Sequence, residues 1–223
     1  MRPAGGIRAV VFDLDGVILQ TEEVWDEVRG RYVVEHGGRY DEEAQRAMMG
    51  MSAPEWSRFL ADDLGVPGTP EEISADIVRL MEARYREQLP LIPGAEEAVE
   101  RLATRWPLGL ASSSNRPLID AALGLSGLGR YFTATVSSEE VPRGKPAPDV
   151  YLEATRRLGV SPEHCVAVED SHSGIRSAKS ARMRVIAIPN PSFPPDTDAL
   201  SLADLVLESI DELDVDAVEA AAS

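Results

Sequence analysis

The chain has 223 residues, 43% of them hydrophobic, which is enough for one large α/β domain or for a core domain with a smaller insert. Its 38 acidic and 22 basic residues give a formal net charge of −16, which repels nucleic acids and anionic membrane surfaces and argues against binding to either. Cys165 is the only cysteine, so no intramolecular disulfide can form, and the N-terminus lacks the apolar run of a signal peptide, so a cytoplasmic enzyme is expected.

The first predicted strand, at about residues 7–12, ends in two acidic residues. Its apolar run is typical of a buried strand, and Asp13 and Asp15 follow it in a turn that contains Gly16. Carboxylates at the end of a core strand are costly to bury without a partner, so they indicate a cation or a reacting centre beside them. An ordinary turn rich in Asp and Gly explains this short pattern equally well, so other segments have to decide.

Residues 20–90 show helical periodicity and no convincing strand. The apolar positions of the four expected helices are Val24, Val28 and Tyr32; Ala44, Ala47 and Met48; Trp56, Phe59 and Leu60; and Ile73, Ile77, Leu80 and Met81. Thr69 and Glu72 form a capping box at the start of the last helix, with Pro70 at its first position. The pattern predicts an all-helical cap domain of residues 19–91, inserted into a core domain made of residues 1–18 and 92–223.

From Pro93 onward, expected helices alternate with short apolar strands. The expected strands are 108–111, 134–137, 166–168, 185–188 and 205–207. The expected helices are 95–104, 117–123, 149–158 and 174–181, followed by an acidic, alanine-rich helix or frayed tail from about residue 211. This alternation predicts a parallel sheet covered by helices on both faces, in which ligands bind beyond the carboxyl ends of the strands.

Polar residues follow several of these strands. They are Ser112, Ser113, Ser114 and Asn115 after the second strand, Lys145 in a proline-stiffened loop, and Glu169 and Asp170 after the strand at 166–168. Each group alone has a structural explanation, namely a capped turn, a solvated loop lysine or a helix cap. Together with the first strand they would bring carboxylates, an ammonium group and neutral donors to one edge of the sheet. Phosphoryl transfer assisted by Mg²⁺ requires this combination, and a cation with a lysine can reverse the local field for an anionic substrate.

Three motifs, in this order, resemble the haloacid dehalogenase (HAD) superfamily. They are Phe-Asp-Leu-Asp-Gly-Val at 12–17, Gly-Lys-Pro-Ala-Pro-Asp at 144–149 and Glu-Asp-Ser-x-x-Gly-Ile at 169–175. The resemblance covers nearly the whole chain and is to the helical-cap branch, subfamily I, which includes β-phosphoglucomutase and phosphoglycolate phosphatase. It implies an α/β fold with a Rossmann-like parallel sheet core covered by helices on both faces and an inserted all-helical cap domain.

The resemblance also implies roles for the acidic residues. Asp13 corresponds to the nucleophile that forms an aspartyl phosphate, and Asp15 to the general acid that protonates the leaving oxygen and then activates water. Asp13, Asp170 and the backbone carbonyl of Asp15 would bind Mg²⁺, and Glu169 would hold a metal-bound water. Activity is then expected to vanish with EDTA and to return with Mg²⁺.

The remaining site residues would bind the phosphoryl group. By the same resemblance, Ser112 would hold phosphoryl oxygens with help from Ser113 and Asn115, and Lys145 would neutralise them while contacting Asp13. The partner is therefore expected to be a small phosphorylated metabolite, and the protein a monomer or homodimer. His172 lies at the edge of the last motif, and the sequence leaves its role open.

The family contains several chemistries, which particular residues separate. The dehalogenase branch lacks the second aspartate, present here as Asp15, and the phosphonate-cleaving branch needs a cap lysine, whereas residues 20–90 contain none. Neither dehalogenation nor phosphonate cleavage is therefore expected of this chain. A phosphoric monoester hydrolase is expected, with a mutase similar to β-phosphoglucomutase as the alternative and a non-catalytic phosphate-binding protein as a further one.

The mutase alternative depends on the cap. β-Phosphoglucomutases carry cap cations that bind a second phosphate, and the corresponding positions here are Trp25, Met49 and Ala53. Arg39, Arg46 and Arg58 could substitute, but they stand at other positions. Replacement of the cations by Trp25 and by the methionines at 48, 49 and 51 suggests a less charged leaving group, although such residues are also common in helix packing.

Overall fold

A six-stranded parallel sheet forms the centre of the protein in the computed structural model, which describes residues 6–48, 51–191 and 194–222. The strands are β1 (Ala9–Phe12), β2 (Leu108–Ser112), β3 (Phe132–Ser137), β4 (Cys165–Glu169), β5 (Arg184–Ala187) and β6 (Leu205–Val206). Their order is β3-β2-β1-β4-β5-β6, so the order reverses at the central strand β1. A ligand is therefore expected at the carboxyl ends of β1 and β4, where the connections diverge.

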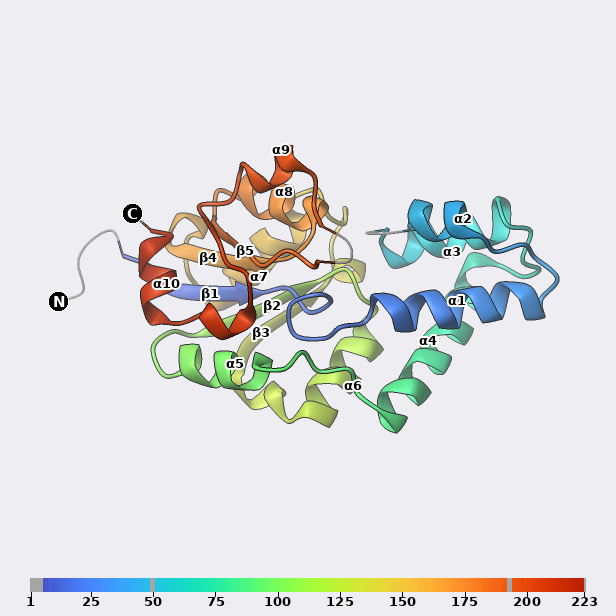
Figure 1. Ribbon diagram of the computed structural model, residues 1–223, viewed down its shortest axis with the longest axis horizontal. Helices are drawn as coiled ribbons and strands as arrows, with labels where there is room; N and C mark the ends of the chain where they lie inside the picture. Colours follow the sequence, from blue (N-terminus) through green and yellow to red (C-terminus); the bar gives the residue numbers. More distant parts are fainter. Residues whose placement is uncertain (1–5, 49–50, 192–193, 223) are drawn as a thin grey trace.

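Helices cover both faces of the sheet, as the alternating pattern predicts (Figure 1). They are α5 (Ala95–Ala103), α6 (Arg116–Ser126), α7 (Asp149–Leu158), α8 (His172–Ser180), α9 (Thr197–Leu200) and α10 (Val215–Ala220). Val10 and Phe12 of β1 pack on the side of α5, α6 and α10, whereas Ala9 and Val11 pack on the side of α7 and α8. All four side chains are fully buried, which explains why β1 has no polar residue before Asp13.

The described residues of the insert after β1 form four helices, which lie beyond the carboxyl ends of the strands (Figure 1). They are α1 (Glu22–Glu35), α2 (Glu42–Met48), α3 (Ala53–Asp62) and α4 (Pro70–Glu87). The predicted capping box at Thr69 is confirmed, since the Thr69 hydroxyl accepts a hydrogen bond from the backbone N–H of Glu72. The inserted all-helical cap is therefore present.

One residue assigned to the apolar stripe of α4 is misplaced. Leu80 is 40% exposed, and Val78 is buried with Ile77 and Met81 instead. The reason is that α4 packs against three helices, α1, α3 and α6. Its buried surface is therefore wider than one apolar stripe and includes Val78 rather than Leu80.

The two connections between the insert and the core run next to each other. Leu19 and Leu91 form an antiparallel bridge, the N–H of Gln20 donates to the carbonyl of Pro90 (2.8 Å), and the N–H of Ile92 donates to the carbonyl of Ile18 (2.9 Å). The chain therefore leaves and re-enters the core at one place. The limits of the core at 1–18 and 92–223 and of the cap at 19–91 stay a prediction.

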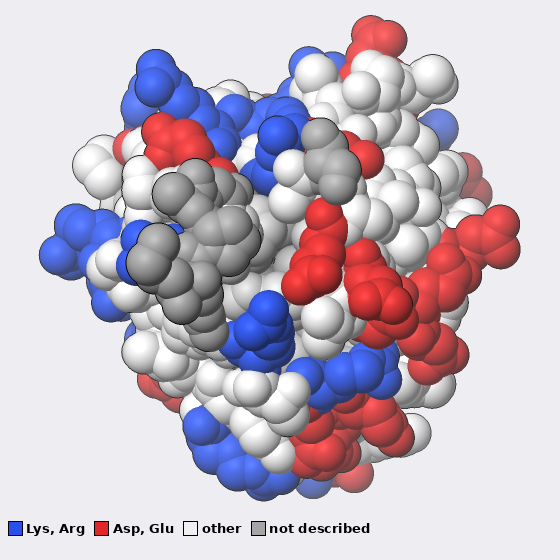
Figure 2. All heavy atoms as spheres, turned by 90° about the vertical axis from the view of Figure 1, so that its left-hand side faces the viewer, with Lys and Arg blue, Asp and Glu red and all other residues white. Residues whose placement is uncertain are grey.

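The end of the molecule away from the cap helices carries charged side chains of both signs (Figure 2). Lys and Arg lie next to Asp and Glu on this face, which differs from the broad basic surface typical of nucleic-acid-binding proteins. In the part of the chain that the structure describes, no helix is long and apolar enough to cross a membrane.

Candidate active site

The register of the sheet brings the acidic residues together. Phe12 of β1 pairs with Val168 of β4, and the N–H of Asp13 donates to the carbonyl of Val168 (3.0 Å). Asp13, which follows β1, and Glu169, the last residue of β4, therefore lie at the same level. The carboxylates of Asp13, Glu169 and Asp170 each place an oxygen within 4.8 Å of the others, and all three residues are buried.

Two glycines allow the backbone to approach this acidic cluster closely. A Cβ atom on Gly16, whose φ is +83°, would lie 1.9 Å from an Asp170 oxygen, and one on Gly174 would lie 1.9 Å from a Glu169 oxygen. Larger residues are excluded at both positions unless the carboxylates move. The oxygen donors of the cluster fit a hard divalent cation such as Mg²⁺.

Lys145 supplies positive charge to the cluster. Its Nζ lies 2.8 Å from Oδ1 of Asp13 and 2.6 Å from Oε1 of Glu169, and its side chain is 2% exposed. Burial acts to lower the pKa of Lys145, but Asp13 and Glu169 raise it above its ordinary value, so the ammonium form persists. The same Glu169 oxygen accepts a hydrogen bond from the Tyr151 hydroxyl at 2.6 Å.

One lysine does not balance three carboxylates. Burial raises the pKa of Asp13 to about 8, with Lys145 lowering it and Glu169 raising it. Burial also raises the pKa of Asp170 well above its ordinary value, and Glu169 and Asp13 add to the effect. Because the fully ionised cluster is unfavourable, a divalent cation would stabilise it and return Asp13 to its carboxylate form.

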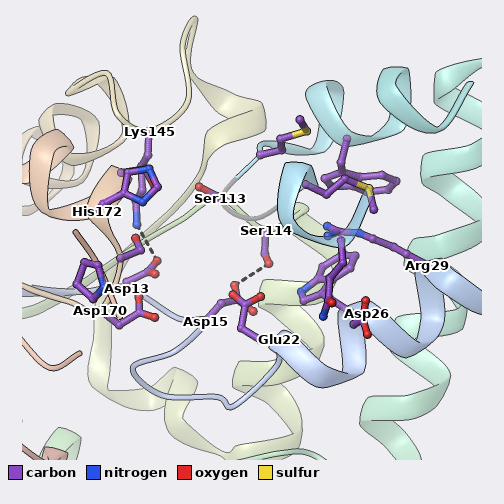
Figure 3. Close-up of a pocket in the computed structure, with 18 of the residues that line it drawn as sticks. Asp13, Asp15, Glu22, Asp26, Arg29, Ser113, Ser114, Lys145, Asp170 and His172 are labelled. Atoms are coloured by element: carbon purple, nitrogen blue, oxygen red, sulfur yellow. Dashed lines mark hydrogen bonds and ion pairs between the residues drawn. The ribbon is translucent and has the colours of Figure 1, made fainter. Parts of the chain in front are cut away.

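Asp15 points away from this cluster and is held by hydroxyl groups. Its Oδ2 accepts from Ser114 at 2.7 Å (Figure 3). Its Oδ1 accepts from Thr21 at 2.6 Å, and Ser112 also donates to Oδ2 at 3.3 Å. A half-buried carboxyl with a fixed orientation suits proton transfer. The sequence placed Ser114 among the polar residues after the second strand, but it did not identify Thr21 or the contact of either residue with Asp15, because only the side-chain geometry shows these contacts.

The three predicted phosphate-binding residues of the loop after β2 lie in different surroundings. Ser113 lines the pocket between core and cap, whereas the buried Ser112 donates to Asp15. Asn115 also lines this pocket, but its amide nitrogen donates to Glu139 at 2.7 Å and to Ser74 of α4 at 3.4 Å. Ser113 therefore offers a hydroxyl beside the Lys145 end of the pocket (Figure 3).

The pocket has a volume of about 170 Å³ and is lined from both sides. The core contributes Asp13, Asp15, Lys145, Asp170 and the exposed His172, which is the first residue of α8. The cap side includes Glu22, Trp25, Asp26, Arg29, Met48 and Trp56. The reacting carboxylates therefore lie at one end and a mixed aromatic and charged wall at the other (Figure 3).

Arg29 is one of the pocket residues that the sequence interpretation missed. Its guanidinium lies 4.3 Å from the ring centre of Trp25 and 5.0 Å from that of Trp56. Burial lowers the pKa of Arg29 to about 10, while Tyr40 and Glu22 act in the opposite direction, so the group keeps its charge at neutral pH. The signal in the sequence is the spacing of four between Trp25 and Arg29, which places both on one face of α1.

The other cap positions considered from the sequence lie elsewhere. Arg39, Arg46 and Arg58 are exposed and do not line the pocket, and Ala53 is buried at the start of α3. Met49 lies outside the described residues. Trp25 packs against Trp56 with ring centres 5.9 Å apart.

Comparison with known proteins agrees with this geometry. The model of the haloacid dehalogenase-like hydrolases matches residues 7–182. Hexitol phosphatase B of Escherichia coli (strain K12) is 34% identical over 213 residues, which are 93% of this chain and 94% of that protein. The solved structure of a CbbY mutant from Rhodobacter sphaeroides with xylulose-(1,5)bisphosphate has a TM-score of 0.85 at 28% identity, and the match covers 96% and 99% of the two chains.

One relative is considerably longer. The bifunctional riboflavin kinase/FMN phosphatase of Arabidopsis thaliana is 31% identical over 203 residues, which are 90% of this chain but 53% of that protein. The family model and the full-length match to hexitol phosphatase B agree with the fold and with the clustered acids. The chain therefore belongs to the haloacid dehalogenase-like hydrolases and is a phosphatase of that family.

Proposed function

We propose that this protein is a Mg²⁺-dependent phosphatase that hydrolyses a small phosphorylated metabolite, such as a sugar phosphate, through an aspartyl phosphate on Asp13. The observation that carries the proposal is the contact of Asp13 with Lys145 inside a buried acidic cluster that opens into the pocket. Such a carboxylate is activated by its surroundings and faces a space that a phosphate ester can enter. The cluster has the oxygen ligands that Mg²⁺ prefers.

In the first step, a carboxylate oxygen of Asp13 attacks phosphorus while the ester oxygen leaves. Asp15 gives that leaving oxygen a proton, for which Thr21 and Ser114 orient its carboxyl. In the second step, Asp15 takes a proton from a water molecule, whose oxygen attacks phosphorus and releases Asp13. Inorganic phosphate and an alcohol are the products, and both aspartates return to their starting forms.

The positive groups stabilise the charge on the transferred phosphoryl group. Asp13, Asp170 and the backbone carbonyl of Asp15 would hold Mg²⁺, with Glu169 holding a metal-bound water, and the cation would neutralise charge on the phosphoryl oxygens. Lys145 contributes an ammonium group next to Asp13. Ser112, Ser113 and Asn115 are the candidate donors to phosphoryl oxygens, and Ser113 is the one that is half exposed in the pocket.

The substrate class rests on the relatives and on the cap. Relatives of this chain are named hexitol phosphatase B and fructose-1-phosphate phosphatase YqaB, both from Escherichia coli. The mutase alternative requires a second phosphate to bind in the cap, and Arg29 is the arginine that reaches the pocket there. Since Glu22 and Asp26 lie in the same wall, their charges oppose a second phosphate, which supports hydrolysis of a singly phosphorylated sugar.

Phosphate release from a panel of sugar phosphates, phosphoglycolate, nucleoside monophosphates and glycerol phosphates tests the proposal. We expect release with Mg²⁺, none with EDTA, and none from Asp13→Asn. Isomerisation of β-glucose 1-phosphate without net phosphate release would establish the mutase alternative. Tight phosphate binding without turnover would instead establish the phosphate-binding alternative. A cytoplasmic location and a monomeric or dimeric state complete the proposal.

A further inference from the structure

The cap end of the pocket contains a cation without an ion-pair partner. Among the described residues, no carboxylate lies within ion-pair distance of the Arg29 guanidinium, and its buried Nε atom has no hydrogen-bond partner. The nearby Asp26 is already engaged, because it accepts a hydrogen bond from the Tyr40 hydroxyl at 2.7 Å. Arg29 as a whole is partly exposed, but a buried guanidinium N–H without an acceptor is costly unless a ligand supplies an oxygen atom.

The two tryptophans fix this cation in place. Trp25 on α1 and Trp56 on α3 are 7% and 2% exposed, and both rings contact the guanidinium of Arg29. Cation–π contacts of this kind stabilise a desolvated arginine without using its N–H donors. The donors therefore remain available to a molecule in the pocket, in an orientation set before that molecule binds.

The charges around Arg29 restrict what that molecule can be. Glu22, Asp26 and Asp15 lie close enough to raise the pKa of Arg29 against the effect of burial. A second anionic group on the substrate would meet these acids as well as Arg29. Hydroxyl groups avoid this conflict, because their oxygens accept from Arg29 and their protons can be donated to carboxylates.

The position of Arg29 along α1 relates it to the leaving group. Thr21, at the start of α1, donates to Asp15, whereas Arg29 lies two helical turns beyond Glu22, or roughly 10 Å along the axis. In the proposed reaction Asp15 protonates the leaving oxygen. The far end of the leaving group, rather than the phosphoryl group, is therefore the part that faces Arg29.

We propose that Arg29 is the specificity-determining residue of this enzyme and that it selects a neutral polyhydroxy leaving group by donating hydrogen bonds to its hydroxyl oxygens. The inference rests on the proposed phosphatase activity and adds to it the substrate class and the residue that recognises it. Trp25 and Trp56 are positioning residues, since they hold the guanidinium and form an apolar wall for the carbon chain.

Three phosphate esters of equal carbon number test this inference. They are a hexitol 6-phosphate, whose leaving group is neutral and hydroxylated, hexyl phosphate, which has no hydroxyls, and 6-phosphogluconate, whose leaving group is an anion. kcat and KM are measured for each with Mg²⁺, for the native protein and for Arg29→Met and Arg29→Lys. Arg31→Met is the matched control, because Arg31 lies on the same helix with a side chain that is 76% exposed and pairs with Glu35.

We expect the native enzyme to prefer the hexitol ester over both others. In Arg29→Met, kcat/KM for the hexitol ester should fall about 10- to 100-fold through a rise in KM, the range for losing hydrogen bonds to a charged donor. The fall in kcat/KM for hexyl phosphate should be at least several-fold smaller. The ratio of kcat/KM for the hexitol ester to kcat/KM for hexyl phosphate should therefore decrease strongly. Arg29→Lys should keep part of that ratio, and Arg31→Met should keep all of it.

Other outcomes overturn the inference in distinguishable ways. A preference for 6-phosphogluconate that disappears in Arg29→Met would mean that Arg29 binds an anion. Equal losses on the hexitol and hexyl esters would mean that Arg29 only supports the cap, and a lower melting temperature would accompany them. If the native enzyme hydrolyses none of the three esters but releases phosphate from another ester of the panel, the inference fails and the proposed function stands, whereas release from no ester overturns both.

Discussion

At the scale of single residues, Asp13 has to lose a proton before it can act as a nucleophile or bind a cation. Without a cation, burial raises the pKa of Asp13 to about 8, so most of this carboxyl is protonated at neutral pH. Cation binding must then release protons, and its affinity must increase with pH. Lys145, which lowers the pKa of Asp13, reduces this effect without removing it.

This linkage predicts how pH alters the stabilisation by Mg²⁺. The folded-state pKa of Asp13 lies above the ordinary value of 3.8, so between pH 3.8 and about 8 the cation-free folded state binds more protons than the unfolded state. Its stability therefore falls as pH rises through that interval. We expect the increase in melting temperature on adding Mg²⁺ to be larger at pH 8 than at pH 5.

Differential scanning fluorimetry with and without Mg²⁺ at the two pH values measures this difference. The variant Asp13→Asn, which has no titrating group at this position, should show a smaller pH dependence. Equal stabilisation by Mg²⁺ at both pH values in the native protein would contradict the prediction.

Two buried tyrosines allow a matched test of the hydrogen bond to Glu169. The Tyr151 hydroxyl donates to Glu169, whereas the Tyr85 hydroxyl is buried without a hydrogen-bond partner in the described structure. We expect Tyr151→Phe to lower the free energy of unfolding by about 1–3 kcal/mol, because it removes a bond to a buried charged group. Mg²⁺ affinity should fall about 10- to 100-fold, as for other groups that orient metal ligands.

Tyr85→Phe is the control, and we expect it to leave stability unchanged or slightly increased. Urea denaturation gives the free energies, and calorimetric titration with Mg²⁺ gives the affinities. Equal changes of the free energy of unfolding and of Mg²⁺ affinity in the two variants would show that the hydrogen bond from Tyr151 to Glu169 contributes to neither.

At the scale of elements, the turn after β1 depends on Gly16. Gly16 and Gly37 have almost the same backbone angle, with φ of +83° and +82°, but only Gly16 faces Asp170. An alanine at either position is strained by about 1 kcal/mol. We expect Gly16→Ala to displace Asp170 as well and to lower activity at least tenfold, whereas Gly37→Ala should keep normal activity.

Steady-state hydrolysis at saturating Mg²⁺, together with melting temperatures, separates strain from displacement. The prediction fails if both variants lose stability equally and both keep full activity. Partial recovery of Gly16→Ala at high Mg²⁺ concentration would support displacement of a metal ligand as the cause.

The elements that could be predicted are those whose signal is local. The strand at 7–12 and the residues that follow it depend on an apolar run and a turn, and a parallel sheet necessarily gathers its strand ends at one edge. The contact of Asp13 with Lys145 and the proximity of Glu169 agree with that expectation. The capping box at Thr69 is equally local and was also identified.

The features that could not be predicted depend on contacts between elements. Arg29 was missed because its second aromatic contact, Trp56, comes from a different helix. Tyr151 was missed because its relation to Glu169 requires α7 to pack beside β4. Leu80 was placed in the core because the rotation of α4 depends on three neighbouring helices, which one helical period does not describe.

At the scale of the whole molecule, core and cap share one hydrophobic interior. A continuous cluster of buried residues extends from Val10 and Phe12 of β1 to Trp56 of α3 and Ile77 of α4, and α4 packs directly against α6. We expect thermal unfolding to be a single transition, because the cap helices cannot lose their structure without exposing this cluster. Calorimetry measures it, and two separate transitions would contradict the prediction.

The paired connections at Leu19 and Leu91 make the insert exchangeable. Because these two residues form an antiparallel bridge, their Cα atoms are about 5 Å apart, and any segment whose ends meet at that spacing can be joined there without altering the sheet. Transfer of the helical segment of a related enzyme to this junction would leave Asp13, Lys145 and Asp170 in place. Chimeras of this kind that keep Thr21, which orients Asp15, would separate the chemistry at the strand ends from the choice of metabolite by the helices.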